Sequence, residues 1–225
     1  MSRIDGPRLA PMQDRPARQL IVLIHGFGAD GEDLIGLAPY WRRLLPDAYF
    51  VAPDGPEPCD MAGFGRQWFP LTDFSEEERL SGARAAAPVL DAFIDAELER
   101  LGLGDDNLAL VGFSQGCMMA LHVGLRRARP PAAVVGFSGA LAGAGAVLEA
   151  EMTSRPPILL VHGDQDPIVP VAALHRAVEA LTEAGLSLQS HVERGLGHGI
   201  GPEGLALGGE FLCRMLLDPE GALGA

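Results

Sequence analysis

The chain has few cysteines and no cysteine pair. Cys59, Cys117 and Cys213 are far apart among 225 residues, so they form no CxxC motif and no repeated Cys/His spacing. A zinc site, a redox dithiol and a disulfide framework are therefore not indicated. The chain also lacks the basic, apolar and small-residue regions of a secretory signal at its N-terminus. These absences predict a cytoplasmic protein.

Basic residues are also scarce. Seventeen Lys and Arg against 30 Asp and Glu give a formal net charge of -13, which repels nucleic-acid phosphates and anionic lipid headgroups. The long uncharged run Ala132–Leu148 is broken by four glycines, and we interpret it as strand, turn and helix. We expect no nucleic-acid partner and no stable membrane insertion.

No repeat, low-complexity tract or Gly/Ser linker divides the chain. Its 225 residues and 48% hydrophobic composition suit one core of ordinary size. We expect one domain over residues 1–225, with an irregular segment over about residues 1–18.

Short apolar, β-branched runs alternate with longer amphipathic segments. The expected strands are Gln19–Ile24, Tyr49–Ala52, Leu108–Phe113, Ala132–Phe137, Ile158–Val161 and Leu188–Val192. The expected helices are Asp33–Leu45, Ser81–Leu101 with an irregularity near Pro88, Gln115–Arg127, Val171–Ala184 and Pro202–Leu217. This alternation predicts an α/β fold with a mostly parallel central sheet, helices on both faces and a ligand site at the carboxyl ends of the strands.

The segment from Asp54 to about Leu80 is too long for an ordinary connection. Long irregular segments often form lids or pocket walls, in which case Trp68 and Phe69 would contact substrate. The alternative is a surface excursion in which the two rings fill the core. Both alternatives remain open from the sequence.

The most specific motif is Gly112-Phe113-Ser114-Gln115-Gly116. It lies between an expected strand and an expected helix, as a nucleophile elbow does, where glycines permit the close approach of backbone segments. We therefore predict Ser114 as a catalytic nucleophile. Ser138, in Phe137-Ser138-Gly139, lacks the second glycine of the motif and is interpreted as part of a turn.

A serine nucleophile needs a base, and His198 is the best placed of six histidines. It lies in a glycine-rich loop after the last expected strand. By contrast, His122 and His175 fall in expected helices, His191 falls in an expected strand and His162 lies at a strand end. Asp166, directly before Pro167, is the predicted carboxylate partner, because the order Ser, Asp, His is that of this class of fold. Asp164 is the competitor and suits a turn-stabilising role.

An acyl-transfer site also needs N–H donors for a developing oxyanion. The backbone N–H of Gln115, at the start of a helix, is one candidate. The other is the N–H of Phe27 in the loop His25–Gly31, which follows the first expected strand. His25 is expected to brace this loop. A phosphate-binding loop is not indicated, since neither a GKS/T sequence nor a GxGxxG spacing follows.

Several segments together resemble the carboxylesterase/phospholipase family of α/β-hydrolases, which includes acyl-protein thioesterases and bacterial esterases. The resemblance covers nearly the whole chain and rests on 25-HGFG-28, 65-GRQWF-69, 112-GFSQG-116, 137-FSG-139, 162-HGDQDPIVP-170 and 197-GH-198. It implies the triad Ser114, Asp166 and His198, oxyanion N–H groups on Phe27 and Gln115, and no large cap domain. It also implies no metal or organic cofactor, and a homodimer.

The resemblance implies hydrolysis of carboxylic esters with short to medium acyl chains, of acyl thioesters or of lysophospholipids. Acidic residues between Trp68 and Ser81 argue against a strongly anionic substrate. The N-terminus departs from the family pattern, so antiparallel edge strands are expected to be absent or short. Two alternatives remain: a non-catalytic binding protein of the same fold, and a peptidase or lyase, which would need a larger cap or further charged pocket residues.

Overall fold

A computed structural model of the protein describes residues 4–59, 61 and 63–218. Seven strands of the described chain form one sheet in the order β1-β3-β2-β6-β7-β8-β9. They are β1 Arg8–Leu9, β2 Gln19–Ile24, β3 Ala48–Val51, β6 Leu108–Phe113, β7 Ala133–Phe137, β8 Ile158–Gly163 and β9 Leu188–Glu193. All neighbouring pairs are parallel except β1 with β3. The predicted parallel sheet is confirmed.

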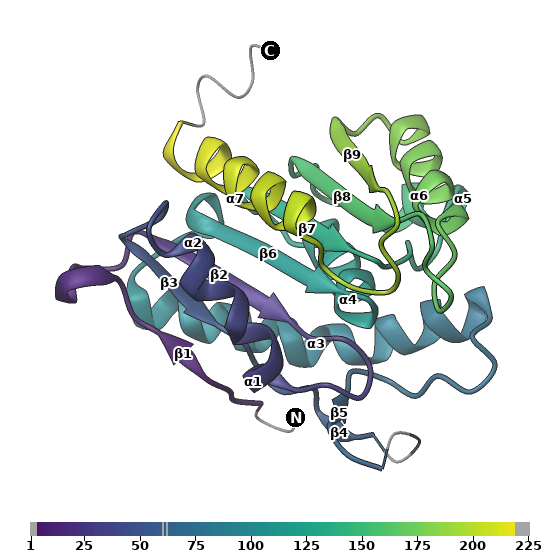
Figure 1. Cartoon of the computed structure of the whole chain (residues 1–225), viewed down its shortest axis with the longest axis horizontal. Coiled ribbons are helices and arrows are strands. Elements are labelled where there is room, and N and C mark those ends of the chain that lie inside the picture. Colours follow the sequence, from purple (N-terminus) through teal and green to yellow (C-terminus); the bar gives the residue numbers. More distant parts are fainter. Residues whose placement is uncertain (1–3, 60, 62, 219–225) are drawn as a thin grey trace.

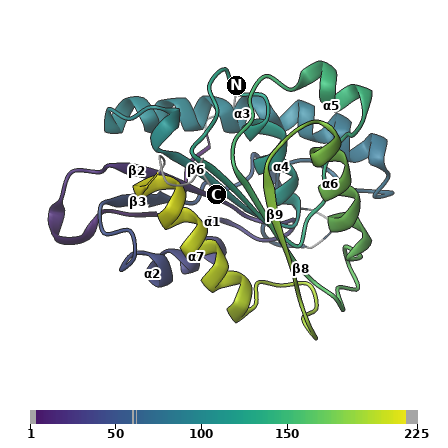
Figure 2. The same ribbon diagram turned by 90° about the horizontal axis from the view of Figure 1, so that it is seen from above.

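Helices cover both faces of this sheet (Figures 1 and 2). One face carries α3 Glu76–Leu101, α4 Gln115–Gly124, the short α5 Ala146–Glu151 and α6 Ala172–Glu183. The other carries α1 Gly31–Leu34, α2 Ala38–Trp41 and α7 Pro202–Leu217. The arrangement is that of an α/β-hydrolase without a large cap, as predicted.

Alternating side chains of the central strands build two separate cores. In β2, Leu20, Val22 and Ile24 pack toward α3 and α4, whereas Ile21 and Leu23 pack toward α2 and α7, and all five are fully buried. Successive side chains of a strand point to opposite faces, so a continuous apolar run is what a strand covered on both sides requires. Each such side chain contributes about 1.5–3 kcal/mol to stability.

Two expectations near the N-terminus can be compared with the structure. The segment predicted as irregular contains β1, which pairs antiparallel with β3 through Arg8↔Val51 and Leu9↔Phe50, and this edge strand is short, as expected. The single helix expected over Asp33–Leu45 is instead α1, the 3₁₀ helix Ile35–Leu37 and α2. Pro39 has no N–H to continue the α-helical bonding, which explains the interruption.

The segment from Asp54 to Leu80 is more ordered than expected. It contains a hairpin of β4 Glu57–Pro58 and β5 Arg66–Gln67. Helix α3 begins at Glu76, five residues earlier than predicted, because Ser75 Oγ accepts the N–H of Glu78. This Ser-x-x-Glu pattern is a capping-box signature that the sequence already carried. Pro88 lies inside α3, which remains one helix to Leu101.

The strand order indicates where this sheet can bind a ligand. From β2 the chain passes to β3 on one side, and β6 then pairs with β2 on the other side. The loops after β2 and β6 therefore diverge at a topological switch point, where open α/β sheets bind ligands. These are the loops that hold Phe27 and Ser114.

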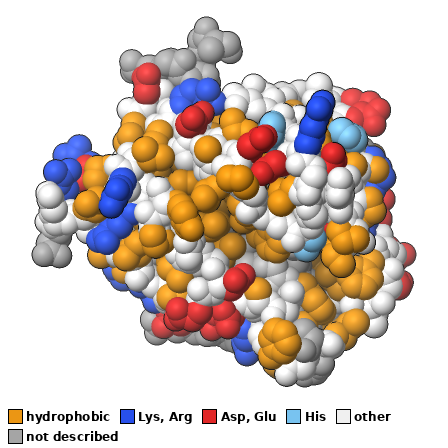
Figure 3. Space-filling view, in the orientation of Figure 1, with side chains coloured by type: hydrophobic (Ala, Val, Ile, Leu, Met, Phe, Trp, Pro, Cys, Tyr) orange, Lys and Arg blue, Asp and Glu red, His pale blue; other side chains and the backbone are white. Residues whose placement is uncertain are grey.

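The face of the molecule shown in Figure 3 has hydrophobic side chains across the area of α2 and α7, with acidic and basic side chains scattered around them. Tyr40, Leu44 and Leu217 are among the exposed apolar residues there. Among the residues that the structure describes, no helix is long and apolar enough to cross a membrane.

Candidate active site

Ser114 occupies a strained turn between β6 and α4. Its φ of 54° lies in the left-handed region, where a residue with a side chain is held only by its surroundings. A Cβ on Gly112 would lie 2.1 Å from Gly116 O, and a Cβ on Gly116 would lie 1.8 Å from Ile24 O. The glycines of the motif are therefore required for β2, β6 and α4 to pack this closely.

Asp166 and His198 meet beyond the ends of β8 and β9. His198 Nδ1 lies 2.7 Å from Asp166 Oδ2. The other oxygen, Asp166 Oδ1, accepts the N–H groups of Ile168 at 2.8 Å and Val169 at 2.9 Å. Burial opposes the charged form of Asp166, but the hydrogen bonds from His198, Val169 and Ile168 outweigh it and lower the pKa of the carboxyl. The carboxylate is thus held ionised and aimed at the imidazole.

The competitor Asp164 has a different task. Its Oδ1 accepts the N–H of Gly195 at 2.6 Å, which ties the turn after β8 to the turn after β9. This is the turn-stabilising role that the sequence left open for it. The structure thus brings Asp166 to His198 and directs Asp164 elsewhere.

His198 lies beside the end of β6, the strand that leads to Ser114. Its ring packs on Phe113, the residue before Ser114, with ring centroids 4.9 Å apart. Because Nδ1 is occupied by Asp166, Nε2 is the nitrogen left to act on a serine hydroxyl. Both residues are described, and the structure shows no hydrogen bond between Ser114 and His198. Catalytic hydrogen bonds that are long in a free enzyme often tighten when substrate binds.

The two predicted oxyanion donors have free N–H groups. The neighbouring N–H groups of Gly28 and Ala29 donate to Arg66 O and Gly26 O, whereas that of Phe27 has no acceptor among the described residues. Gln115 is the first residue of α4, a position whose N–H has no partner within the helix. The positive end of the α4 dipole adds to the same preference for negative charge.

The side chain of Gln115 has a structural role that the sequence did not reveal. It is fully buried, its Oε1 accepts the N–H of Trp68 at 2.9 Å, and its Nε2 donates to Phe69 O at 2.7 Å. The elbow is thereby fastened to the end of the β4–β5 segment. A glutamine next to the nucleophile was the available signal, but only the fold shows what it reaches.

Trp68 and Phe69 are core residues in this structure, with exposures of 1% and 2%. The Trp68 Nε1–H donates to His25 O at 3.0 Å. The structure thus favours the core-filling alternative, and contact of these rings with substrate stays a prediction.

His25 braces its loop, as expected from the sequence. Its Nδ1 lies 2.7 Å from Gly26 O, and its Nε2 accepts the N–H of Gly55 at 2.8 Å. Burial lowers the pKa of His25, so the ring is held neutral. It contacts structural groups of the two loops and not the reacting centre.

A further histidine near Asp166 was missed by sequence reasoning. His162, at the end of β8, has its Nε2 2.7 Å from Val169 O and 3.2 Å from Asp166 Oδ2. Its place four residues before Asp166 was visible, but a lone histidine at a strand end carries no specific meaning without coordinates. In the described residues, no group of three or more His, Cys, Asp or Glu side chains could hold a metal ion.

This sheet, with an elbow serine at the carboxyl end of β6 and an Asp–His pair beyond β8 and β9, defines an α/β-hydrolase. The chain belongs to the phospholipase/carboxylesterase family, whose model matches residues 10–215. This confirms the family suggested by the sequence motifs.

Named relatives agree with this class. The chain is 33% identical over 189 residues to Esterase YpfH of Escherichia coli, covering 83% of this chain and 78% of the relative. It is 31% identical over 157 residues to acyl-protein thioesterase 1 of Schizosaccharomyces pombe, covering 67% and 69%. The crystal structure of esterase PE8 superposes with a TM-score of 0.91 at 44% identity, covering 96% of this chain and all of the other.

These relatives decide between two of the functional classes that the sequence left open. The protein is an enzyme of the esterase and thioesterase class, and the family supports hydrolysis of carboxylic esters or thioesters. The alternative of a non-catalytic binding protein is therefore set aside.

Proposed function

We propose that the protein is a serine hydrolase that cleaves carboxylic esters through an acyl-serine intermediate, with Ser114, Asp166 and His198 as its triad. The observation that carries the proposal is the strained φ of 54° at Ser114, at the N-terminus of α4, on the same edge of the sheet as the 2.7 Å Asp166–His198 contact. Strain of this kind persists only where the surrounding structure holds it, and it is frequent at active sites.

In the acylation half of the proposed reaction, Ser114 Oγ attacks the ester carbonyl carbon while His198 Nε2 takes the hydroxyl proton. The oxyanion that forms accepts the N–H groups of Phe27 and Gln115. Asp166 keeps the proton of His198 on Nδ1 and stabilises the imidazolium. The C–O or C–S bond then breaks, and His198 Nε2 returns its proton to the leaving alcohol or thiol.

In the deacylation half, water repeats these steps on the acyl-enzyme. His198 removes a proton from water as its oxygen attacks the acyl carbon, and Ser114 leaves as the restored hydroxyl. The products are a carboxylic acid and the free enzyme. Every proton that leaves a nucleophile is returned to a leaving group, so no cofactor is needed for balance.

The proposed substrates are small-molecule esters with short to medium acyl chains, with acyl thioesters and lysophospholipids as further classes to compare. Relatives named esterase and acyl-protein thioesterase support the ester and thioester classes. The acidic residues Asp73, Glu76 and Glu77 support a preference for uncharged acyl groups over strongly anionic ones.

Covalent labelling tests the nucleophile. A fluorophosphonate should label the wild type on the peptide that contains Ser114, as seen by mass spectrometry, and should not label Ser114→Ala. Ser138→Ala is the matched control, because Ser138 also has a positive φ, of 46°, and it should still be labelled. Labelling of Ser114→Ala at the wild-type rate would refute the proposed nucleophile.

A substrate panel tests the specificity. Nitrophenyl esters and acyl thioesters of graded chain length should be hydrolysed with an optimum at short to medium length, and an amino-acid anilide should not be cleaved. An anilide rate equal to the ester rate would favour the peptidase alternative.

Three further features are part of the proposal. The free thiols of Cys59, Cys117 and Cys213 support a cytoplasmic location. The charge of -13 supports the absence of a nucleic-acid partner. A homodimer, which the family resemblance implies, and a single domain over residues 1–225 are tested by sedimentation and by limited proteolysis.

A further inference from the structure

Three neighbouring strands end in a row of polar residues. Phe113 of β6 pairs with Phe137 of β7, and Phe137 pairs with Val161 of β8. The next residues, Ser114, Ser138 and His162, therefore stand in line along the carboxyl edge of the sheet. The mechanism proposed above uses Ser114 and leaves His162 without a task.

We propose that His162 is a positioning residue that orients the carboxylate of Asp166 toward His198. The proposal rests on the function proposed above, since it assumes that Asp166 is the carboxylate of the triad. His162 does not touch substrate in this proposal and acts only through Asp166.

The tautomer of His162 follows from its neighbours. Nε2 lies 2.7 Å from Val169 O and 3.2 Å from Asp166 Oδ2. A carbonyl and an ionised carboxylate are acceptors only, so Nε2 must carry a proton. Its N–H donates to Val169 O, and Asp166 Oδ2 lies nearby without a hydrogen bond to the His162 ring. His162 is 1% exposed, so water does not compete for these contacts.

This N–H is linked to Asp166 through Val169. Asp166 Oδ1 holds the N–H of Val169, and the carbonyl of Val169 is in turn held by His162. The turn from Asp166 to Val169 is thereby fixed to the end of β8. Oδ2 remains for His198, which approaches it from the loop after β9 at 2.7 Å. Both histidines lie near Oδ2, but only His198 donates a hydrogen bond to it.

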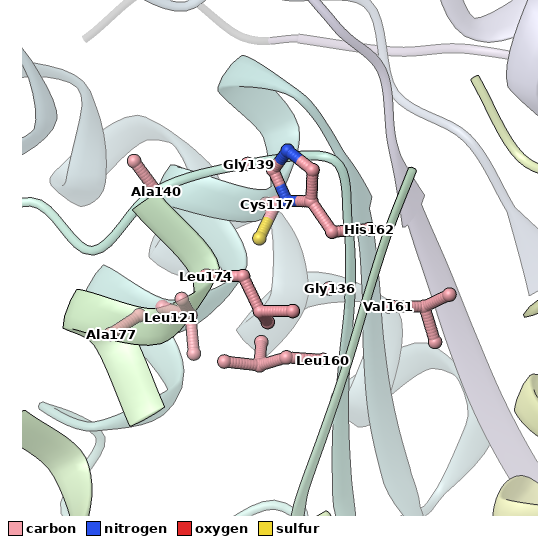
Figure 4. A pocket seen from close by; sticks show the side chains of 10 residues that line it. All are labelled: Cys117, Leu121, Gly136, Gly139, Ala140, Leu160, Val161, His162, Leu174 and Ala177. Atoms are coloured by element: carbon pink, nitrogen blue, oxygen red, sulfur yellow. The ribbon is translucent and has the colours of Figure 1, made fainter. Parts of the chain in front are cut away.

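The other described residues around His162 are mostly apolar. Together with Cys117, His162 lines a cavity of about 10 Å³ whose other lining includes Leu160 and Leu174 (Figure 4). Burial raises the pKa of Cys117 to about 12, so this thiol stays neutral.

A consequence for the rate follows. The N–H of His162 holds Val169 O, and the N–H of Val169 in turn holds Asp166 Oδ1. If the N–H of His162 is removed, the turn from Asp166 to Val169 loses its bond to the end of β8. The carboxylate is then less well placed to receive the N–H of His198, and kcat falls.

Two variants separate the N–H from the bulk of the ring. His162→Phe keeps a ring of similar size and removes the N–H, whereas His162→Gln can place an amide N–H close to the position of Nε2. We expect His162→Phe to lower kcat about 10- to 100-fold with little change in KM, since small misplacements of catalytic groups have effects of this size. His162→Gln should recover most of the lost kcat.

The result that overturns the proposal is a His162→Phe enzyme with wild-type kcat, or one whose defect lies in KM alone. Equal defects in His162→Phe and His162→Gln would also overturn it, because the ring's packing would then be what matters. Histidine-selective NMR of the wild type adds a test that needs no variant: the spectrum should show His162 as the Nε2–H tautomer, and an Nδ1–H tautomer would refute the proposal.

The failure of this inference is distinguishable from failure of the proposed function. Asp166→Asn should abolish most activity if the triad is correct. If Asp166→Asn is inactive while the His162 variants behave as wild type, only the role of His162 is wrong. If Asp166→Asn retains full activity, the triad itself is wrong.

Discussion

Ser114 and Ser138 occupy matching positions at the ends of β6 and β7, both with positive φ, yet their side chains differ in what they bind. The N–H of Ser114 donates to Phe137 O, and the N–H of Ser138 donates to Val161 O. Ser138 Oγ donates to Gly199 O at 3.0 Å, next to His198. The hydroxyl of Ser114 has no such bond in the described chain, so of the two only Ser114 has a hydroxyl available for chemistry.

Replacing each serine should therefore have a different effect on kcat. We expect Ser114→Ala to lower kcat by about three decades or more, because the residual rate comes from oxyanion stabilisation and binding alone. Ser138→Ala removes one anchor of the loop that carries His198 and should lower kcat by less than about tenfold. Steady-state kinetics on one nitrophenyl ester measures both. A larger loss in Ser138→Ala than in Ser114→Ala would contradict the assignment.

Asp166 and Asp164 provide a second comparison. Asp166→Asn should lower kcat by about 10⁴, because an amide can favour the wrong imidazole tautomer. Asp164→Asn changes only the turn bond to Gly195 and should keep kcat within about tenfold. The two proteins can be compared by kcat at one pH and by thermal unfolding. Equal losses in both would show that turn integrity, and not the triad carboxylate, limits the rate.

The elbow glycines make a prediction about stability. Gly116→Ala places a Cβ 1.8 Å from Ile24 O, a backbone atom of the central strand that cannot move alone. We expect about 3 kcal/mol of destabilisation or a failure to fold. Gly36→Ala is the control, because a Cβ there has no atom within 4 Å, and it should change stability by less than about 0.5 kcal/mol. Urea unfolding measures both, and equal stabilities would argue against the close approach of β2 and α4.

His122 makes a prediction about pH. Burial, aided by the charge of Arg126, lowers the pKa of His122 from 6.5 to about 4. The unfolded chain then binds the proton more tightly, so this contribution to stability is present above about pH 6.5 and is lost as pH falls toward 4. Between pH 7 and pH 5, the free energy of unfolding should fall by about 2 kcal/mol from this group alone.

The measurement is urea unfolding at pH 7 and pH 5 for the wild type and for His122→Leu. The variant should lose less stability on acidification than the wild type. His175 is exposed on α6, so the free energy of unfolding of His175→Gln should fall between pH 7 and pH 5 by as much as that of the wild type. If His122→Leu loses as much stability between pH 7 and pH 5 as the wild type does, the prediction is contradicted.

Local pattern was enough for much of this protein. Each expected strand lies within one or two residues of its observed position. The central strands β2, β6, β7 and β8 are buried on both faces and are therefore unbroken apolar runs with turn residues at their ends. The elbow motif places Ser114 correctly between strand and helix for a similar reason: its glycines are demanded by local close approach. Family membership followed from motifs spread over the whole chain.

Errors arose where the outcome depends on distant partners. Strand β1 has two residues and exists only because β3 presents an unpaired edge. The segment over Asp33–Leu45 has helical spacing, but the missing N–H of Pro39 and packing against α7 divide it.

The sequence by itself determined which residues could do the chemistry and in what chain order, because motifs and spacing are local. Only the tertiary structure decided that Asp166 and not Asp164 reaches His198, that Trp68 lies in the core, and that His162 faces the same carboxylate. These contacts join segments whose distances are set by the order and register of strands, and no pattern within one segment encodes them.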